Sequence, residues 1–446
     1  MHIVIIGNGI SGITTARWIR KLSDHSVTVI SSESEHFYSR TALMYIYMGH
    51  MGYKETKPYE DWFWEKNRID LVFDHVTDIN YDQHQLSLKS GKSMSYDKLV
   101  LAVGSKSNKF GWPGQDLNRV TGLYNLQDLE KIEEHSDGLN RAVIVGGGLI
   151  GIELAEMFHS RHIPVTMFVR EKSFWNAVLP REESEMISRH IVKSGIDLRL
   201  GINLQEIVDD GQGNACAAIA KETGDRVDCG YVGLTAGVSP NVGWLKETGL
   251  EVNRGIVVNQ KLETNIPDVY AVGDCAEQSA PRPGRRPVEA IWYTGRMMGE
   301  TCAYNICGHD ISYDPGIWFN SAKFIDIEYQ VYGEVLAKPQ EHHKALYWEH
   351  PDGEKSVRVI YDTRDESIVG FNLMGVRFRH EVCERWLREK TNVKEVIANL
   401  TLANFDPEFY TRYEKDIVNS FNQQTELSLP TPKKSTINQI LSFIKS

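Results

Sequence analysis

The sequence predicts an α/β protein made of two Rossmann-like units followed by a C-terminal α+β domain. A strand, a glycine-rich turn, a helix and a second strand follow one another at the start of the chain, and the same order returns from residue 142. The stretch after residue 313 differs, because short alternating strand-like runs precede a single helix there. Strands joined by helices are typical of a parallel sheet, whereas alternating runs are typical of an antiparallel one.

Composition supports a globular chain and excludes several classes of protein. The 446 residues are 41% hydrophobic and 24% charged, which fits a folded protein of several domains. The 49 Lys and Arg against 60 Asp and Glu give a net charge of −11, which argues against a general nucleic-acid binder. No run of roughly 18 apolar residues predicts a transmembrane helix, and the N-terminus has no signal-peptide pattern. The six cysteines form no CxxC pair, so no metal site is predicted, and their scarcity indicates the cytoplasm.

The first unit carries a phosphate-binding pattern. Apolar spacing predicts a strand at 2–7, a helix at 10–22 and a strand at 27–30. The GNGISG between the first two places glycine where a tight turn, a close approach to a pyrophosphate and close helix packing each require it. The helix N-terminus adds free N–H groups. The residues predicted to contact a dinucleotide are Gly7, Asn8, Gly9, Ile10, Ser11 and Gly12.

Acidic and polar residues follow the second strand of this unit. Ser32 and Glu33 stand where a carboxylate is expected to accept hydrogen bonds from ribose hydroxyls. Glu33 is the candidate acceptor, and the alternative is a solvated loop carboxylate.

The second unit repeats the pattern with a different strand end. A strand at 142–145, a helix through Phe158 and a strand at 165–169 enclose GGGLIG, whose predicted contacts are Gly146, Gly147, Gly148, Leu149, Ile150 and Gly151. Val169 stands where a carboxylate would select NADH, and Arg170 follows it. A guanidinium suits a 2′-phosphate, so we expect NADPH to be favoured. The alternative is a surface arginine beside Glu171, with NADH still used.

Two further segments complete the pattern. YDKLVLAVGS at 96–105 reads as a strand and a turn, and in TNIPDVYAVGDCAE a strand at 269–272 ends in Gly273-Asp274, with a helix expected next. With these four motifs in order over residues 2–312, the chain resembles the flavoproteins with two dinucleotide-binding domains, the pyridine nucleotide–disulfide oxidoreductase superfamily.

The resemblance implies that GNGISG holds FAD and that GGGLIG holds NAD(P)H. It implies an FAD domain at 1–112 and 248–312, an NAD(P)H domain at 113–247, and a C-terminal domain at 313–446 that is often a dimer interface. The further implied FAD contacts are Arg40, Val76, Ala102, Val103, Gly104, Gly273, Asp274, Glu289 and Ala290. The further implied NAD(P)H contacts are Glu153, Arg170 and Gly237.

The chain lacks the redox cysteines of many relatives, which indicates the branch of this superfamily that it resembles. No CxxxxC follows the second strand, and Arg40 stands where relatives with one redox cysteine keep it. Cys302 and Cys307 lie in a predicted helix, where side chains five residues apart point about 140° apart and cannot pair. We therefore expect no redox cysteine.

HFYSR at 36–40 and GRMMGE at 295–300 resemble segments of oxygenase-coupled ferredoxin reductases and apoptosis-inducing-factor-like proteins. This resemblance implies that Arg40 binds the FAD pyrophosphate and that Glu153 lies near flavin N5 as a catalytic residue. The lysine that pairs with this glutamate in relatives falls on Tyr45, so Glu153 is expected to lack that partner. An aromatic of the WFNS segment, Trp318 or Phe319, is expected over the flavin, with a core aromatic as the equal alternative.

The sequence thus predicts an FAD-dependent NAD(P)H oxidoreductase that passes electrons to a small iron–sulfur protein and forms a homodimer. Arg282, Arg285 and Arg286 are a candidate docking loop for an acidic acceptor, or a solvated loop. The first alternative is a peripheral membrane quinone reductase. It depends on an apolar stripe in the tail, made of Ile437, Ile440, Leu441 and Ile444. The second is a redox-gated binding protein of the apoptosis-inducing-factor type.

Overall fold

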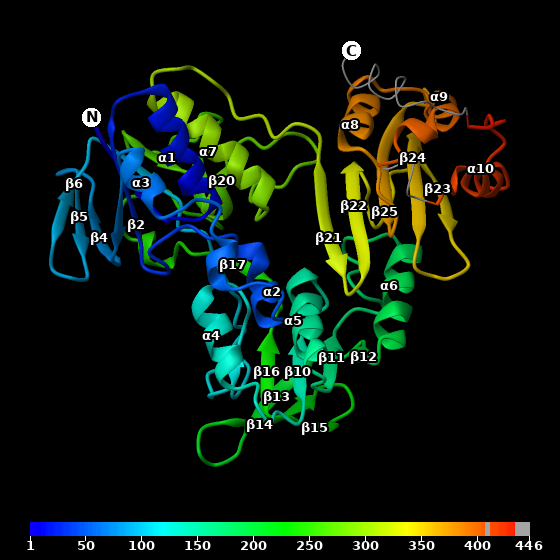
Figure 1. Cartoon of the computed structure of the whole chain (residues 1–446), viewed down its shortest axis with the longest axis horizontal. Helices are drawn as coiled ribbons and strands as arrows, with labels where there is room; N and C mark the ends of the chain where they lie inside the picture. Colours follow the sequence, from blue (N-terminus) through cyan, green and yellow to red (C-terminus); the bar gives the residue numbers. More distant parts are fainter. Residues whose placement is uncertain (406–410, 433–446) are drawn as a thin grey trace.

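The structure is a computed structural model, which describes residues 1–405 and 411–432. It confirms the α/β fold class, and Figure 1 shows three bodies, each built around a sheet. The predicted apolar stripe at 437–444 lies outside the described residues. Among those that are described, no helix has the length and apolar character needed to cross a membrane.

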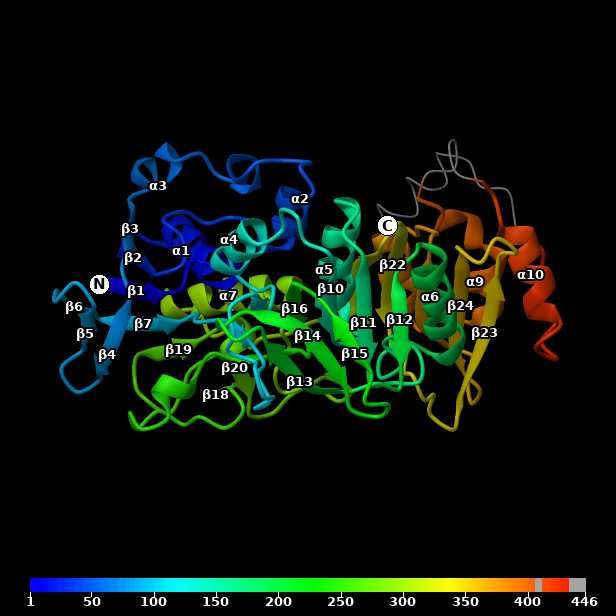
Figure 2. The same ribbon diagram turned by 90° about the horizontal axis from the view of Figure 1, so that it is seen from below.

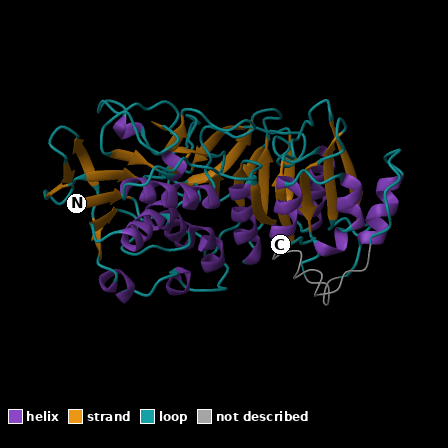
Figure 3. Cartoon of the chain, turned by 90° about the horizontal axis from the view of Figure 1, so that it is seen from above, coloured by secondary structure: helices purple, strands orange, loops and turns teal. Residues whose placement is uncertain are grey.

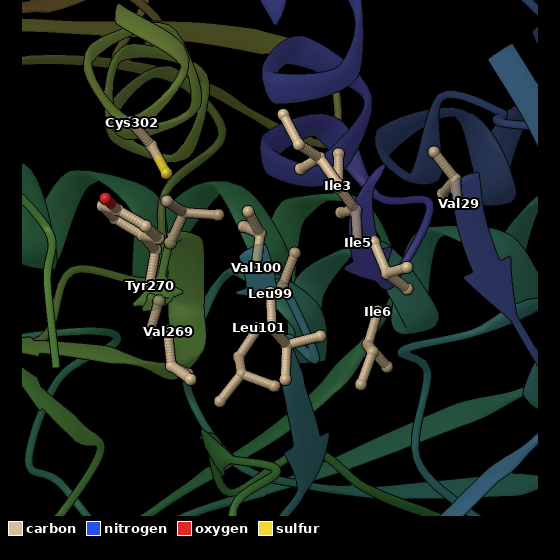
Figure 4. Close-up of a cluster of buried hydrophobic side chains, with 14 of the residues drawn as sticks. Ile3, Ile5, Ile6, Val29, Leu99, Val100, Leu101, Val269, Tyr270 and Cys302 are labelled. Carbon is tan, nitrogen blue, oxygen red and sulfur yellow. The ribbon is translucent and has the colours of Figure 1, made fainter. Parts of the chain in front are cut away.

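The first sheet is parallel and brings together segments that are far apart in the sequence. Its strand order is β19-β7-β1-β2-β3. The strands are β1 (His2–Ile6), β2 (Ser26–Ser31), β3 (Ile69–Phe73), β7 (Lys98–Leu101) and β19 (Val269–Ala271). Figure 4 shows the apolar side chains of β1, β7 and β19 meeting in one core, with Cys302 pointing into it from helix α7. β1 therefore lies at the centre of this sheet, as its uninterrupted apolar run predicts.

Two helices of this first body pack closely because glycine forms part of their contact. α1 (Ile10–Leu22) lies against α7 (Trp292–Ile306). A Cβ atom on Gly299 would come within 2.5 Å of the carbonyl oxygen of Ser11, and one on Gly295 within 2.6 Å of the Ser11 hydroxyl. The GRMMGE glycines thus permit the backbone of α7 to approach α1.

The second body repeats the parallel order with its own core. Its sheet is β12-β11-β10-β16-β9. The strands are β9 (Val120–Thr121), β10 (Ala142–Val145), β11 (Val165–Val169), β12 (Asp197–Leu200) and β16 (Tyr231–Leu234), and the helices are α4 (Leu126–Glu134), α5 (Leu149–Ser160) and α6 (Arg181–Lys193). Figure 1 shows these elements below the other two bodies, and in the view of Figure 2 they lie in the middle of the molecule, where β12 and α6 overlap the C-terminal sheet.

The third body is an antiparallel sheet with helices. Its order is β21-β22-β25-β24-β23. The strands are β21 (Phe319–Phe324), β22 (Ile327–Gly333), β23 (His343–Glu349), β24 (Ser356–Asp362) and β25 (Ile368–Met374), and the helices are α8 (His380–Arg388), α9 (Val393–Ala398) and α10 (Glu414–Asn422). The alternating apolar pattern predicts one strand at 324–332, whereas in the structure this stretch forms the turn and the second strand of a hairpin. Ile325, with φ +62°, lies in the turn after β21.

The remaining elements are short, and their strands form small sheets of two or three strands. The other strands are β4 (Val76–Asn80), β5 (Gln85–Leu88), β6 (Ser93–Ser95), β8 (Ser105–Ser107), β13 (Leu204–Asp209), β14 (Ala215–Ala220), β15 (Arg226–Asp228), β17 (Val238–Pro240), β18 (Ile256–Val258) and β20 (Ala276–Gln278); the short helices are α2 (Leu43–Tyr47) and α3 (Trp62–Lys66). Figure 3 shows that most helices lie along one side of the strands.

The element after Gly273-Asp274 also differs from the prediction. A 3-10 turn (Gly273–Cys275) leads into β20, and α7 begins only at Trp292. β20 pairs with β18, and this pairing keeps the segment in an extended conformation.

Candidate active site

The turn between β1 and α1 forms an open cradle at the helix N-terminus. Gly7 has φ +112°, and a Cβ atom there would lie 2.1 Å from the carbonyl oxygen of Ala102. A Cβ on Gly12 would lie 2.0 Å from the Gly7 carbonyl oxygen, whereas one on Gly9 would meet no atom of the protein within 4 Å. Gly9 caps α1 without a side-chain hydrogen bond, so the first N–H groups of the helix are left for a ligand.

The turn between β10 and α5 has the same construction. Gly146 has φ +132°, and its Cβ would lie 2.5 Å from the carbonyl oxygen of Thr235. A Cβ on Gly151 would lie 2.4 Å from the Gly146 carbonyl oxygen, and one on Gly148 would again meet nothing within 4 Å. Each unit therefore keeps one glycine that the protein's own packing does not require, and it lies where a pyrophosphate is expected to approach.

The residues after β7 and β19 continue from the first cradle. Gly104 and Gly273 have φ +64° and +78°. Burial raises the pKa of Asp274, while Arg40 and hydrogen bonding oppose that rise. The hydroxyl of Tyr124 donates to Asp274 Oδ2 at 3.3 Å and accepts from the N–H of Ser105 at 2.8 Å. The sequence reasoning missed Tyr124, because only the fold brings it to Asp274.

Glu33 and Arg40, both predicted to contact the nucleotide, are bonded to each other in this structure. Arg40 Nη2 lies 2.6 Å from Glu33 Oε2, and Arg40 Nη1 lies 3.1 Å from Glu33 Oε1. The Tyr38 hydroxyl and the N–H of Leu126, the latter at 3.2 Å, donate to the same carboxylate. A ribose or phosphate contact by either side chain would therefore be made from within this ion pair.

The other predicted contacts near the first cradle have structural partners. The Asn8 amide donates to the carbonyl oxygen of Ser34 at 2.8 Å, and its oxygen accepts from the Ser31 hydroxyl at 3.0 Å. The Ser32 hydroxyl lies 3.3 Å from His75 Nδ1, and Val76 is buried at the start of β4. The glycine turn is thereby fixed to the end of β2.

A cavity of about 1550 Å³ lies where the three bodies meet. Its wall includes Ser105 beside Gly104, Leu149 beside Gly148, and Ala290. Trp318 also lines the cavity, whereas Phe319 packs on Tyr293 with ring centroids 4.2 Å apart. Of the two aromatic candidates, Trp318 is therefore the one that faces this space.

Glu153 lines this cavity beside a second carboxylate and a lysine. Burial raises the pKa of Glu153 to about 7; Glu156 adds to the rise and Lys323 opposes it. Lys323 Nζ donates to Glu156 Oε1 at 2.6 Å and lies 5.8 Å from the centroid of the Tyr45 ring. Tyr45 stands at the position where relatives have the lysine that pairs with this glutamate. In this structure Lys323 of β21 brings an ammonium group close to the same place. Lys323 was missed because the strand pattern does not reveal that β21 packs on α5.

Trp175 is a third residue of the site that the sequence patterns do not reveal, after Tyr124 and Lys323. It has φ +55°, lines the cavity, and packs against Phe324 and Tyr329 at centroid distances of 5.8 and 6.0 Å. A non-glycine residue with positive φ is kept only where its surroundings hold it, and the Phe324 and Tyr329 rings hold Trp175 here.

An ion pair follows the end of β11, at the position where we expect the protein to distinguish NADPH from NADH. Val169 is fully buried, and a Cβ on Gly147 would lie 2.6 Å from Val169 Cγ1. Arg170 Nε donates to Glu171 Oε1 at 2.7 Å, with side chains 75% and 22% exposed. Val169 is therefore a core residue, and Arg170 and Glu171 are the groups available to a ribose or phosphate. Gly237, with φ +87°, lies close to the Asn108 amide.

The three arginines of the basic loop at 282–286 differ in their ion-pair partners. Arg285 bonds Glu289 through Nε and Nη2 at 2.6 and 2.7 Å, and both side chains are nearly buried. Arg282 pairs with Asp314 at 2.6 Å. Arg286 is exposed and has no ion-pair partner among residues 1–405 and 411–432. Arg285 and Glu289 thus stabilise the loop, and Arg286 is the loop's outward charge.

The six cysteines are free thiols in this structure. Cys302 is fully buried in α7, where burial raises the pKa of its thiol, and Cys307 follows the end of that helix. A raised pKa keeps a thiol protonated and makes it a poor nucleophile.

Comparison with known proteins decides the family. Residues 1–299 match the family model described as pyridine nucleotide-disulphide oxidoreductase. The chain belongs to that family. It is therefore an oxidoreductase of the FAD-dependent, pyridine-nucleotide type.

Two curated relatives are electron-transfer reductases by name. The NADH-rubredoxin oxidoreductase of Clostridium acetobutylicum is 29% identical over 312 residues, which cover 70% of this chain and 76% of that protein. The nitric oxide reductase FlRd-NAD(+) reductase of Salmonella paratyphi A is 32% identical over 304 residues, covering 67% and 79%.

A solved structure matches nearly the whole chain in fold. The structure of a NAD-dependent persulfide reductase from A. fulgidus superposes with a TM-score of 0.82 at 22% identity, covering 95% of this chain and 83% of that one. At this identity the match shows the shared fold alone.

Proposed function

We propose that this protein is a reductase that takes electrons from NAD(P)H through FAD and delivers them to a small iron–sulfur protein of the rubredoxin or ferredoxin type. The observation that carries the proposal is the pair of open glycine cradles, one at Gly9 and one at Gly148, with a cavity whose wall runs from Ser105 to Leu149. The relatives named for rubredoxin and FlRd support the class of acceptor. A cytoplasmic compartment and a homodimer stay predictions.

The first cradle is proposed to hold FAD and the second NAD(P)H. Residues 7–12 would offer backbone N–H groups to the FAD pyrophosphate, and Asp274 would offer its carboxylate to the ribityl chain. Residues 146–151 would offer backbone N–H groups to the pyrophosphate of the nicotinamide nucleotide. When bound, FAD accepts a hydride and releases electrons singly, and the protein supplies position and electrostatics. Glu153, whose pKa is raised to about 7, is proposed to hold an exchangeable proton on the cavity wall at neutral pH.

Glu156→Gln is expected to move the pH dependence of flavin reduction to lower pH. Glu156 raises the pKa of Glu153 and Lys323 lowers it, so removing the Glu156 charge favours ionised Glu153. The check is the pH profile of anaerobic flavin reduction by NADH, in which Glu153→Gln should lose that titration. Glu185→Gln is the matched control, because Glu185 pairs with Arg181 on the exposed face of α6. An unchanged profile in Glu156→Gln contradicts this role of Glu153.

The pair Arg170–Glu171 is proposed to set the choice between NADPH and NADH, with Arg170 favouring NADPH. A charge-assisted bond to a 2′-phosphate is worth about 1.5–3 kcal/mol, and the exposure of Arg170 puts its contact at the lower end. We therefore expect Arg170→Ala to lower kcat/KM for NADPH about tenfold and to leave NADH nearly unchanged. Glu171→Ala is expected to affect NADH more than NADPH. An equal loss with both nucleotides in Arg170→Ala would show that the arginine does not read the phosphate.

Exposed cations beside the cavity are proposed to attract an acidic acceptor. Arg254 and Arg286 both line the cavity and are exposed, although the chain as a whole is acidic. The test is kcat/KM for reduced acceptor formation with rubredoxin, which the double change Arg254→Glu and Arg286→Glu should lower several-fold at low salt. Reduction of a small neutral quinone by the same variant should be unchanged. Equal rates with rubredoxin at low salt would exclude this docking site.

A further inference from the structure

Two histidines and an aspartate form a cluster of possible metal ligands in the third body, apart from both glycine cradles. One ring nitrogen of His342, one of His343 and a carboxylate oxygen of Asp362 all lie within 4.8 Å of one another. His342 Nε2 is 3.7 Å from Asp362 Oδ2. Three such atoms at this separation can reach one ion with bonds of about 2.0–2.2 Å after small side-chain movements.

Sheet register, and not a loose loop, builds this cluster. His343 and Asp362 are direct cross-strand partners of β23 and β24, which lie side by side in Figure 1. Their side chains therefore share one face of the sheet. The backbone of His342 is fixed too, because its carbonyl oxygen accepts from the N–H of Thr363 at 2.8 Å and from its hydroxyl at 3.0 Å. The His343 and Asp362 side chains are only 7% and 9% exposed.

A carboxylate stands behind one of the histidines. Glu334 Oε1 lies 3.2 Å from His343 Nδ1, and the Gln340 amide donates to the same oxygen at 2.7 Å. Glu334 can accept a hydrogen bond from the Nδ1–H of neutral His343, which leaves the Nε2 lone pair available for an ion. Metal-binding histidines usually have such a carboxylate behind them, which fixes the ring and its tautomer.

Arg364 is the group that competes with an ion. Its Nε bonds both oxygens of Asp362, at 2.9 and 3.1 Å, and its Nη2 bonds Oδ2 at 2.5 Å. With the bond from the Arg364 backbone N–H to Oδ1 at 2.9 Å, these contacts take up the roughly four acceptor positions of the Asp362 carboxylate, so an ion reaches Oδ2 only by displacing the Arg364 side chain. The Arg364 side chain is 68% exposed, so it can turn into water when an ion takes its place beside the carboxylate.

We propose that His342, His343 and Asp362 bind a divalent transition-metal ion of the zinc class, with Glu334 as the residue that positions His343. Two imidazoles with one carboxylate suit zinc and exclude a preference for calcium or magnesium, which take oxygen ligands. Because Glu334, Asp362 and Arg364 also line the cavity, the ion would stand at its margin. No local pattern in the sequence predicts this site, because only the β23–β24 register brings residues 342–343 to residue 362.

The test is zinc chloride titration of tag-free, chelator-treated full-length holoprotein by calorimetry. We expect one ion per chain, little heat with magnesium chloride, and loss of binding in His342→Ala/His343→Ala. Glu334→Gln should weaken binding about 10- to 100-fold, as is usual for a group behind a metal ligand. Flavin absorbance and far-ultraviolet circular dichroism should be unchanged in these variants.

His350→Ala is the matched control. His350 lies in the same domain, with its Nδ1 2.9 Å from Asp352 Oδ2, but it belongs to no three-ligand cluster among the described residues. It should bind zinc as the unchanged protein does. Absence of stoichiometric zinc binding, or equal binding by the double histidine variant, overturns the proposal. So does an equal loss in His350→Ala.

Discussion

Gly9→Val is expected to yield protein without FAD. Gly9 has φ −68° and ψ −179°, an extended conformation that valine adopts readily, and a Cβ there meets no protein atom within 4 Å. The substitution therefore leaves the protein's own packing intact and fills the space proposed for the pyrophosphate. We expect almost complete loss of flavin, measured as the ratio of visible flavin absorbance to protein absorbance after purification.

Gly148→Val is the matched control in the second cradle. A Cβ atom on Gly148 also meets no protein atom within 4 Å. Valine there should therefore block the nicotinamide nucleotide and leave FAD bound. This variant should purify yellow and be reduced by dithionite, but not by NADH or NADPH. If Gly9→Val keeps full flavin occupancy, the assignment of the first cradle is wrong. If Gly148→Val loses its flavin and Gly9→Val does not, the two assignments are exchanged.

Arg358→Met is expected to lower the free energy of unfolding by about 3–5 kcal/mol. Arg358, on β24, bonds the Glu183 carboxylate of α6 through Nε and Nη2 at 2.7 and 2.8 Å, and Glu183 is fully buried. Asn372 also donates to Glu183 at 3.0 Å. Without Arg358 the carboxylate stays buried with only one neutral partner, so the contact of the second and third bodies weakens. The measurement is urea unfolding followed by circular dichroism.

Two further variants test whether the loss of stability comes from the unpaired buried charge of Glu183 and not from the loss of an arginine as such. Arg181→Met removes an arginine that is 82% exposed beside Glu185 and should change stability by at most about 0.5 kcal/mol. Adding Glu183→Leu to Arg358→Met should recover most of the loss, because an apolar pair needs no charge compensation. A cost below about 1 kcal/mol for Arg358→Met would contradict this account of the interface.

Much of the fold was predictable because its local patterns agree with its contacts. The strand at 142–145, the strand at 165–169 and the helix at 10–22 match β10, β11 and α1, since both faces of these parallel strands are buried. The roles of the glycines in both turns follow from the same spacing. The hairpin turn at Ile325 and the short strand β20 were missed, because neither has a local signal that outweighs the apolar run or glycine turn around it.

The candidate site was less predictable because its remaining parts come from distant segments. Lys323 reaches Glu156 across 167 positions, and the Tyr124 hydroxyl reaches Asp274 across 150. The bond between Arg40 and Glu33 joins two residues whose expected roles were separate. Val169 was expected to mark a ligand-facing position, but it is the last core residue of β11. Side-chain direction at a strand end depends on sheet twist and packing, which spacing alone does not give.

In the proposed function, nicotinamide-derived electrons pass through protein-bound FAD to an iron–sulfur acceptor without the help of a cysteine. The most direct measurement is anaerobic stopped-flow mixing of the purified protein, with all six cysteines changed to Ser or Ala, first with NADH or NADPH and then with oxidised rubredoxin. We predict that the nucleotide bleaches the visible flavin band and that rubredoxin restores it with matching loss of its own oxidised absorbance. A flavin that is present but is not bleached by either nucleotide, or is bleached and not reoxidised by rubredoxin, would contradict the account.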